Sequence, residues 1–199
     1  MNKLITLILL TITLNSSAMA QQAKKFKELK FKITSEVINV SADSLWTIAR
    51  EFQDVGIWST SVDHSTGNGD AEFEGATCSE RTCHVDIKGY DQIHEKLTLF
   101  DDTSRELEYK ITGGTPDFVL FTSNRWRVVE VGPQKSLVEM DITIHLKRFI
   151  GALLGGQMKK QISKNVRQVC TDLKIYAETG KVSSAKKARM QTLAQSQNL

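Results

Sequence analysis

The chain has 199 residues, of which 40% are hydrophobic and 25% are charged. This is an ordinary globular composition, and the length suits one domain with a single core. Residues 1–20 contain one lysine and no acid, so residues 21–199 carry 25 Lys and Arg against 23 Asp and Glu, a formal charge of +2. A balance this close to neutral argues against a general nucleic-acid-binding protein.

The amino terminus has the three parts of a secretory signal peptide. Lys3 precedes an apolar run from Leu4 to Leu14, and the small-residue pattern Ala18-Met19-Ala20 follows it. The run is too short to cross a bilayer, which needs roughly twenty apolar residues. We therefore expect residues 1–20 to be a cleaved signal peptide and the mature protein to be periplasmic or secreted.

The next segments predict a strand, a helix and an exposed loop. A basic lead-in becomes a strand over residues 31–40, after which Ser41 or Asp43 offers a side-chain oxygen to cap a helix. The helical spacing of apolar residues that follows ends at Gly56. Residues 63–70 are polar and rich in turn-forming residue types, so we expect a mobile surface loop there.

The middle of the chain predicts a meander of antiparallel strands. Turn-forming residues separate apolar-rich segments at residues 72–78, 83–88, 92–100, 105–112, 118–131 and 136–146. Consecutive strands without intervening helices favour an α+β fold over alternating strand and helix units.

Residues 149–177 predict a long amphipathic helix. Apolar residues recur in it at steps of three or four, at Ile150, Leu153, Leu154, Met158, Ile162, Val166, Val169, Leu173 and Tyr176. The opposite side is rich in lysine, which is ordinarily a solvated face and is also compatible with peripheral contact with an anionic membrane. We expect one α+β domain over residues 21–180, a curved antiparallel β-sheet wrapped around this long C-terminal α-helix with a cavity between them. Residues 181–199 are expected to form a flexible basic tail.

The three cysteines predict one disulfide and one free thiol. Cys78 and Cys83 flank only four residues, and a hairpin with its turn at residues 79–82 would bring them face to face. Cys170 falls on the apolar stripe of the last helix, where a buried, inert thiol is expected.

Several local patterns occur in an order that resembles a known superfamily. They are Val40-Ser41-Ala42-Asp43-Ser44-Leu45-Trp46, Trp58 followed by Val62, Gly75-Ala76, Glu95-Lys96-Leu97, Phe100-Asp101-Asp102 and Tyr109-Lys110-Ile111. Together they resemble the START-related, Bet v 1-like (SRPBCC) superfamily over residues 33–177, in particular its polyketide cyclase/dehydrase branch. The chain departs from that pattern at residues 59–61, where a Pro often occurs, and after Gly75, where an Arg often follows. The resemblance implies a helix-grip fold with an apolar cavity under the last helix, which serves sterols, lipids, polyketides and other hydrophobic molecules. Some members of the superfamily are enzymes and many only bind.

Strand alternation selects the candidate site residues, because neighbouring side chains point to opposite faces of a sheet. Glu95 shares a face with Ile93, Leu97 and Leu99, so this carboxyl points into apolar company. The residues expected to line the cavity are Trp58, Leu97, Tyr109, Asn124, Trp126, Met140 and Met158. Glu95 and Tyr109 are the candidate catalytic acid/base groups; the alternative is that Glu95 pairs with an Arg or a Tyr hydroxyl and shapes the pocket.

Other chemistries have little support in the sequence. His84 and His94 fall on the outward face, so we expect no metal site, and no nucleophile has a pattern that pairs it with His64. Neither a phosphate loop nor a dinucleotide fingerprint is present, so no cofactor is expected. We expect a monomer that carries a hydrophobic small molecule, such as a lipid, isoprenoid or polyketide. A cyclase or dehydratase acting on such a ligand is the alternative, and a structural module with a vestigial pocket is a third class.

Overall fold

The structure is a computed structural model that describes residues 25–87 and 89–196. The signal peptide expected at residues 1–20 lies outside the described residues. In chain order the elements are β1 (Phe26–Thr34), α2 (Ala42–Ala49), the short 3₁₀ helix η1 (Phe52–Asp54), α3 (Val55–Trp58), β2 (His64–Asn68), β3 (Glu80–Ile87), β4 (Tyr90–Asp101), β5 (Glu106–Gly113), β6 (Val119–Gly132), β7 (Lys135–Lys147), α4 (Arg148–Thr179) and α5 (Ser184–Ser196).

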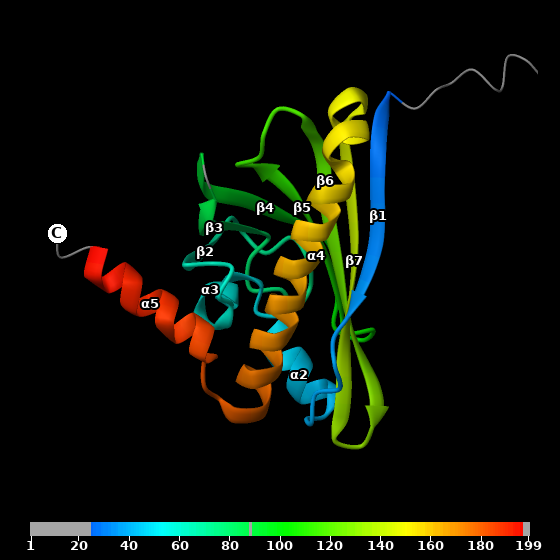
Figure 1. Cartoon of the computed structure of the whole chain (residues 1–199). Coiled ribbons are helices and arrows are strands. Elements are labelled where there is room, and N and C mark those ends of the chain that lie inside the picture. The colour runs from blue at the N-terminus through cyan, green and yellow to red at the C-terminus, as the bar shows by residue number, and fades with distance from the viewer. Residues whose placement is uncertain (1–24, 88, 197–199) are drawn as a thin grey trace, which may run out of the picture.

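The seven strands form one antiparallel sheet in the order β1-β7-β6-β5-β4-β3-β2. Strands β2 to β7 are a meander, and β1 closes the far edge beside β7. The long helix α4 crosses one face of this sheet, with α2 and α3 near its lower end (Figure 1). The α+β fold with a sheet wrapped around a long C-terminal helix is therefore confirmed.

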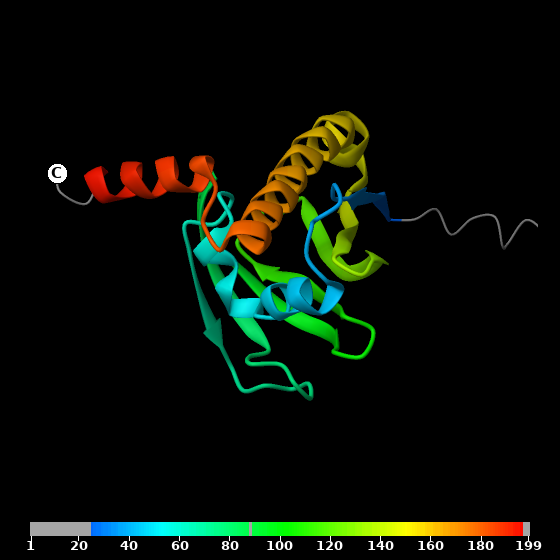
Figure 2. The same ribbon diagram turned by 90° about the horizontal axis from the view of Figure 1, so that it is seen from below.

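Helix α4 packs closely over the β1 and β7 end of the inner face of the sheet and leaves space over the remaining strands. Its contacts are mainly with β1 and, to a lesser extent, β7. Glycine permits this approach, because a Cβ at Gly151 would lie 2.5 Å from Cβ of Lys27 and 3.0 Å from Cβ of Leu146. Seen from below, α4 stands over the hollow of the curved sheet (Figure 2). The space toward β3, β4 and β5 is where a cavity can form.

The inner face of the sheet is apolar, as strand alternation predicts. On β7 the buried side chains are Val138, Met140, Ile142, Ile144 and Leu146. The expectation for Leu99 is wrong, because a bulge between Leu97 and Leu99 shifts the register of β4 against β5. Phe100 is therefore buried in its place, while Leu99 is half-buried.

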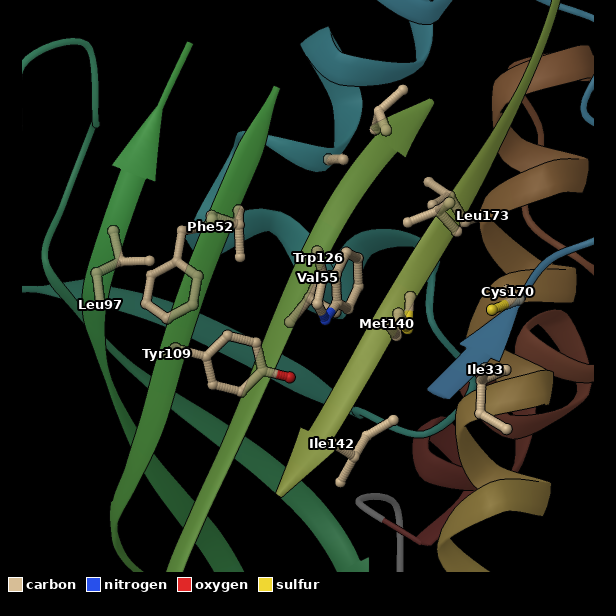
Figure 3. Packing of buried hydrophobic residues seen from close by; sticks show 14 of the residues in the cluster. Ile33, Phe52, Val55, Leu97, Tyr109, Trp126, Met140, Ile142, Cys170 and Leu173 are labelled. Carbon is tan, nitrogen blue, oxygen red and sulfur yellow. The ribbon is translucent and has the colours of Figure 1, made fainter. Parts of the chain in front are cut away.

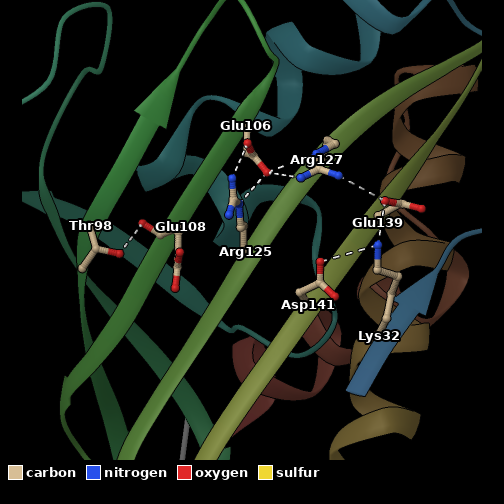
Figure 4. A network of polar contacts seen from close by, with 8 residues as sticks. All are labelled: Lys32, Thr98, Glu106, Glu108, Arg125, Arg127, Glu139 and Asp141. Carbon is tan, nitrogen blue, oxygen red and sulfur yellow. Dashed lines mark hydrogen bonds and ion pairs between the residues drawn. The ribbon is translucent and has the colours of Figure 1, made fainter. Parts of the chain in front are cut away.

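The outer face of the sheet carries a network of charges (Figure 4). Arg125 binds Glu106 through two hydrogen bonds of 2.5 and 2.7 Å, and Arg127 reaches both Glu106 and Glu139. Lys32 of β1 joins the network through Glu139 at 2.9 Å. The bonds from Arg125 and Arg127 lower the pKa of Glu106, whose side chain they cover. This face is thus polar and internally paired, which leaves the opposite face to hold the core.

Three sequence-based boundaries differ from the structure in the first half. The first strand begins earlier than expected and ends at Thr34, and Ile38 makes only an isolated bridge to Ser136. Residues 64–68 form the edge strand β2 and not a loop. Residues 72–78, expected to be a strand, are loop, because β2 occupies the place beside β3 that they would have needed.

The predicted disulfide between Cys78 and Cys83 is not present, and all three cysteines are free and buried. The turn expected between them does not exist, because Glu80 to Cys83 is already extended strand in β3. Cys83 lies opposite Ser65 of β2 and Ile93 of β4 in the sheet register. Cys78 thus lies just before β3 and Cys83 lies within it, so the two do not face each other across a hairpin.

The C-terminal segment expected to be a flexible tail contains helix α5. Lys186 is almost fully buried there, and its Nζ donates a 2.6 Å hydrogen bond to the carbonyl of Val62. Arg189 binds both carboxylate oxygens of Asp63 at 2.7 Å. Lys186 and Arg189 thus bind α5 to the loop before β2.

The first turns of α4 are more exposed than the apolar stripe predicts. Phe149 is 80% exposed and Leu153 is 72% exposed, because the helix begins at the edge of the sheet. The stripe is covered further along the helix, where Cys170 and Leu173 are buried. Within residues 25–196, apart from residue 88, no helix has the length and apolar content needed to cross a membrane.

Candidate functional site

A cavity of about 910 Å³ lies between α4 and the inner face of the sheet. It continues into a smaller inner chamber of about 180 Å³, and eight residues line both: Ser61, Ile87, Ile93, Glu95, Tyr109, Asn124, Asn165 and Val166. The volume falls within the range of about 300–1,000 Å³ that is usual for small-molecule sites. The two spaces are best described as one site with an outer and an inner chamber.

The wall of the outer chamber is mainly apolar and is built from three parts of the fold. Helix α4 contributes Met158, Ile162 and Val166, and β7 contributes Ile142 and Ile144. Pro116 and its neighbours in the connection between β5 and β6 complete one side of the chamber. Such a wall excludes water from a bound ligand and favours apolar molecules.

Glu95 is a carboxylate buried in the inner wall, and it is paired. Nε of Arg81 donates a 2.5 Å hydrogen bond to its Oε2. Nη1 of Arg81 donates to the carbonyl of Phe52 at 2.5 Å, and the guanidinium lies 4.0 Å from the centre of the Phe52 ring. The geometry therefore holds a neutral ion pair at the inner end of the cavity.

Tyr109 and Asn124 form a second polar pair from adjacent strands. Nδ2 of Asn124 donates to the Tyr109 hydroxyl at 3.2 Å. Burial, followed by the nearby charge of Glu95, raises the pKa of Tyr109 well above its ordinary value. Tyr109 is therefore a neutral hydrogen-bonding group over the whole physiological range. Figure 3 shows its hydroxyl pointing from β5 toward β6, on which Trp126 lies.

The thiol of Cys83 also faces the inner chamber. Its Sγ donates to Oε2 of Glu95 at 3.5 Å. Burial raises the pKa of this thiol to about 12, so the reactive thiolate is scarce at neutral pH. Cys83 contributes shape and a weak donor rather than a nucleophile.

Charged residues line part of the outer chamber. They are Arg189 of α5, Asp63 just before β2, and Asp86 of β3. Arg189 binds Asp63 and also reaches Asp86 at 2.9 Å. Helix α5 is thereby tied to residues that line the outer chamber.

The structure distributes the predicted site residues over three environments. Glu95, Tyr109 and Asn124 line both chambers, Met158 lines the outer one, and Trp126 and Met140 line the inner one. Leu97 and Trp58 are buried in the core outside both linings. Trp58 packs against Trp126 with ring centres 6.4 Å apart, so it supports the wall from behind.

Two residues that matter to the site were not selected from the sequence. Arg81 lies two positions before Cys83 and so shares its inward face, which strand alternation could have shown once β3 was placed correctly. Arg189 lies in the segment assigned to a flexible tail, and nothing in its local pattern indicates contact with Asp63.

A curved sheet that grips a long helix above an apolar cavity defines a class of proteins that enclose hydrophobic small molecules. Residues 30–178 match the family described as polyketide cyclase/dehydrase and lipid transport, and the chain belongs to that family. No curated protein matches the chain. The expected relationship to the START-like and Bet v 1-like proteins is therefore confirmed at the level of the family.

Solved structures show the same fold at low sequence identity. A truncated norcoclaurine synthase from Thalictrum flavum has a TM-score of 0.61 at 15% identity, covering 79% of this chain and 98% of that one. The Zhui aromatase/cyclase from a Streptomyces species has a TM-score of 0.56 at 11% identity, covering 79% and 99%. A START superfamily protein from Mycobacterium smegmatis has a TM-score of 0.50 at 15% identity, covering 73% and 98%. These likenesses establish the fold of the chain.

Proposed function

We propose that this protein binds and carries a hydrophobic small molecule, of the lipid, isoprenoid or polyketide kind, in the cavity under α4. The observation that carries the proposal is the cavity of about 910 Å³, whose wall is mainly apolar and also carries polar groups, including Glu95 and Asn124 at its inner end. Polar groups of this kind orient a ligand, while the apolar wall supplies the affinity.

The ion pair between Arg81 and Glu95 supports carriage over acid/base catalysis. A general acid or base must be free to exchange a proton with the ligand. Oε2 of Glu95 instead accepts from Arg81 and from Cys83. Glu95 is thus part of the wall in this proposal, which is the structural role that its place on β4 left open.

A cyclase or dehydratase is the second candidate, favoured by one observation. Glu95, Tyr109 and Asn124 converge on both chambers, so acid/base groups do border the ligand space. The family description and two of the structural relatives, a synthase and an aromatase/cyclase, are consistent with such chemistry.

One experiment separates the two candidates. The protein is incubated with an extract of apolar metabolites from its own host, and the molecules that it retains are compared by mass with those supplied. A carrier returns its ligand unchanged. New products that disappear in Glu95→Gln or Tyr109→Phe, while ligand uptake persists, would show an enzyme and overturn the proposal.

Export from the cytoplasm is also part of the proposal. It is supported by the charged, apolar and small-residue segments of residues 1–20. Cleavage after Ala20 would leave Gln21 as the first residue of the mature protein, which mass spectrometry measures directly. A mature protein that retains Met1 would contradict export.

A further inference from the structure

Two buried polar atoms near the inner chamber have no hydrogen-bond partner among the described residues: Oδ1 of Asn124 and Nε1 of Trp126. Asn124 is 9% exposed and Trp126 is 5% exposed. A buried polar atom without a partner destabilises the folded state, so nearly all such atoms in folded proteins are paired. Both residues line the inner chamber, but the two atoms themselves are covered, so a bound molecule reaches them only when the side chains turn toward the chamber.

The two side chains leave the same face of one strand. Asn124 and Trp126 are two residues apart on β6 and share its inner face, so their Cα atoms are about 7 Å apart. Long side chains at this spacing can turn toward one shared group and hydrogen-bond to it. Trp58, whose Nε1 is also unpaired, stands behind Trp126 and does not line the chamber.

The chemistry of the two atoms selects the group that fits. An indole N–H only donates, and an amide oxygen only accepts. A single group bonded to both must therefore accept one hydrogen bond and donate another, which a ligand hydroxyl does and which a buried water does in its absence. A carbonyl or ether lacks the donor, and an ammonium group lacks the acceptor.

The surroundings of this position favour a neutral group. The charge of Glu95 is balanced by Arg81 at 2.5 Å, so the charged groups among the described residues of the inner lining are paired with each other. The Tyr109 hydroxyl accepts from Nδ2 of Asn124 and so fixes the amide whose Oδ1 would accept the ligand's hydrogen bond. An ionised carboxylate or phosphate here would be desolvated without a counter-charge of its own.

We propose that the ligand is an apolar molecule with a hydroxyl at its leading end, and that this hydroxyl accepts from Nε1 of Trp126 and donates to Oδ1 of Asn124. This inference rests on the proposed function and specifies its ligand class. It also makes Asn124 and Trp126 the residues that discriminate a hydroxylated ligand from an otherwise similar hydrocarbon.

The test compares two probes of similar shape, 2-naphthol and 2-methylnaphthalene, by equilibrium dialysis. The quantity of interest is the ratio of their dissociation constants, because a change in this ratio between variants cancels differences in the hydration of the probes. In Asn124→Leu and in Trp126→Phe, the preference for 2-naphthol should fall about fivefold to tenfold relative to wild type. Thr122→Val removes another polar group from the cavity wall and should leave the ratio unchanged.

The outcomes separate this inference from the proposed function. If neither probe binds the wild type, the hydrophobic site itself is refuted and the inference with it. If both bind but the ratio is the same in all four proteins, or falls equally in Thr122→Val, only the hydroxyl site is overturned. A second readout does not depend on how well the variants fold. The Nε1–H resonance of Trp126 in the wild type should shift with 2-naphthol and much less with 2-methylnaphthalene, and equal shifts would overturn the inference.

Discussion

Arg81 donates a hydrogen bond from Nε to Oε2 of Glu95 at 2.5 Å, and both side chains are buried in the wall of the cavity. The pair joins β3 to β4, because the two residues lie opposite each other in the pairing of these strands. Burial opposes the charge on Arg81, but the charge and hydrogen bond of Glu95, together with Cys83 and Tyr109, outweigh it, and the pKa of Arg81 is raised. The site therefore contains a fixed dipole rather than a free acid.

Removing the charge of Glu95 should destabilise the protein. Glu95→Gln leaves Arg81 buried without its counter-charge, which typically costs about 3–5 kcal/mol, and urea unfolding measures the loss. The double variant Arg81→Met, Glu95→Leu should regain most of it, since no charge is left buried. Lys96→Gln is the control, because its pair with Glu72 is solvent-accessible and should contribute less than about 1 kcal/mol. A Glu95→Gln protein as stable as the control would contradict the structural role of the pair.

Two glycines of α4 should respond in opposite directions to alanine. A Cβ at Gly151 would lie 2.5 Å from Cβ of Lys27, whereas nothing lies within 4 Å of a Cβ at Gly156. Gly151→Ala should destabilise by about 1–2 kcal/mol, because the helix must move from β1. Gly156→Ala should stabilise by about 0.5–1 kcal/mol through helix propensity. Thermal unfolding measures both, and a stabilising Gly151→Ala would refute the close packing of α4 on β1.

All three cysteines should titrate as free thiols only after unfolding. Burial raises the pKa of Cys83 to about 12 and that of Cys170 to about 11, and it raises the pKa of Cys78 as well. Alkylation at neutral pH should therefore be slow in the native protein and reach three thiols per chain in denaturant. A count of one in denaturant would restore the disulfide expected from the spacing of Cys78 and Cys83.

Docking of α5 should depend on pH through Asp63. The hydrogen bonds from Arg189 hold the pKa of Asp63 below its ordinary value near 3.8. A lowered folded-state pKa contributes stability above the unfolded-state value, and this is lost as the pH falls below about 4. Hydrogen exchange of residues 184–196, relative to β6 at the same pH, should accelerate over that range.

Arg189→Met should give the fast exchange already at neutral pH and remove its dependence on pH. Lys187→Met, which alters an exposed residue of the same helix, is the control. Equal protection of α5 in Arg189→Met and wild type would show that the ion pair does not hold the helix.

The apolar pattern predicts most of the fold, because strand alternation and helical spacing report burial directly. It predicts the inner face of β7 correctly, and Glu95, Tyr109 and Asn124, which it assigns to inner faces, line the cavity. It fails at β2, whose five residues are polar apart from Gly67, because this edge strand is defined by backbone pairing and close packing and not by an apolar pattern. A Cβ at Gly67, for instance, would lie 2.4 Å from Oε1 of Gln53.

The other failures come from contacts that no local pattern encodes. The bulge that leaves Leu99 half-buried depends on how β4 pairs with β5. Helix α5 is held by Lys186 and Arg189, whose partners lie more than a hundred residues earlier in the chain. Leu97 falls on the predicted face but packs outside the cavity. Strand alternation predicts which face of the sheet a side chain lies on, but not which part of that face borders the cavity.

The most direct test of the central claim is native mass spectrometry of protein purified from its own host, in the wild type and two matched variants. Val166 lines both chambers, so Val166→Trp should fill the cavity. Leu153 is 72% exposed on the same helix, so Leu153→Trp adds the same bulk outside it. The proposed function predicts one bound small molecule in the wild type and in Leu153→Trp, and the bare polypeptide mass in Val166→Trp. A wild type without bound mass, or the same bound mass in all three proteins, would contradict it.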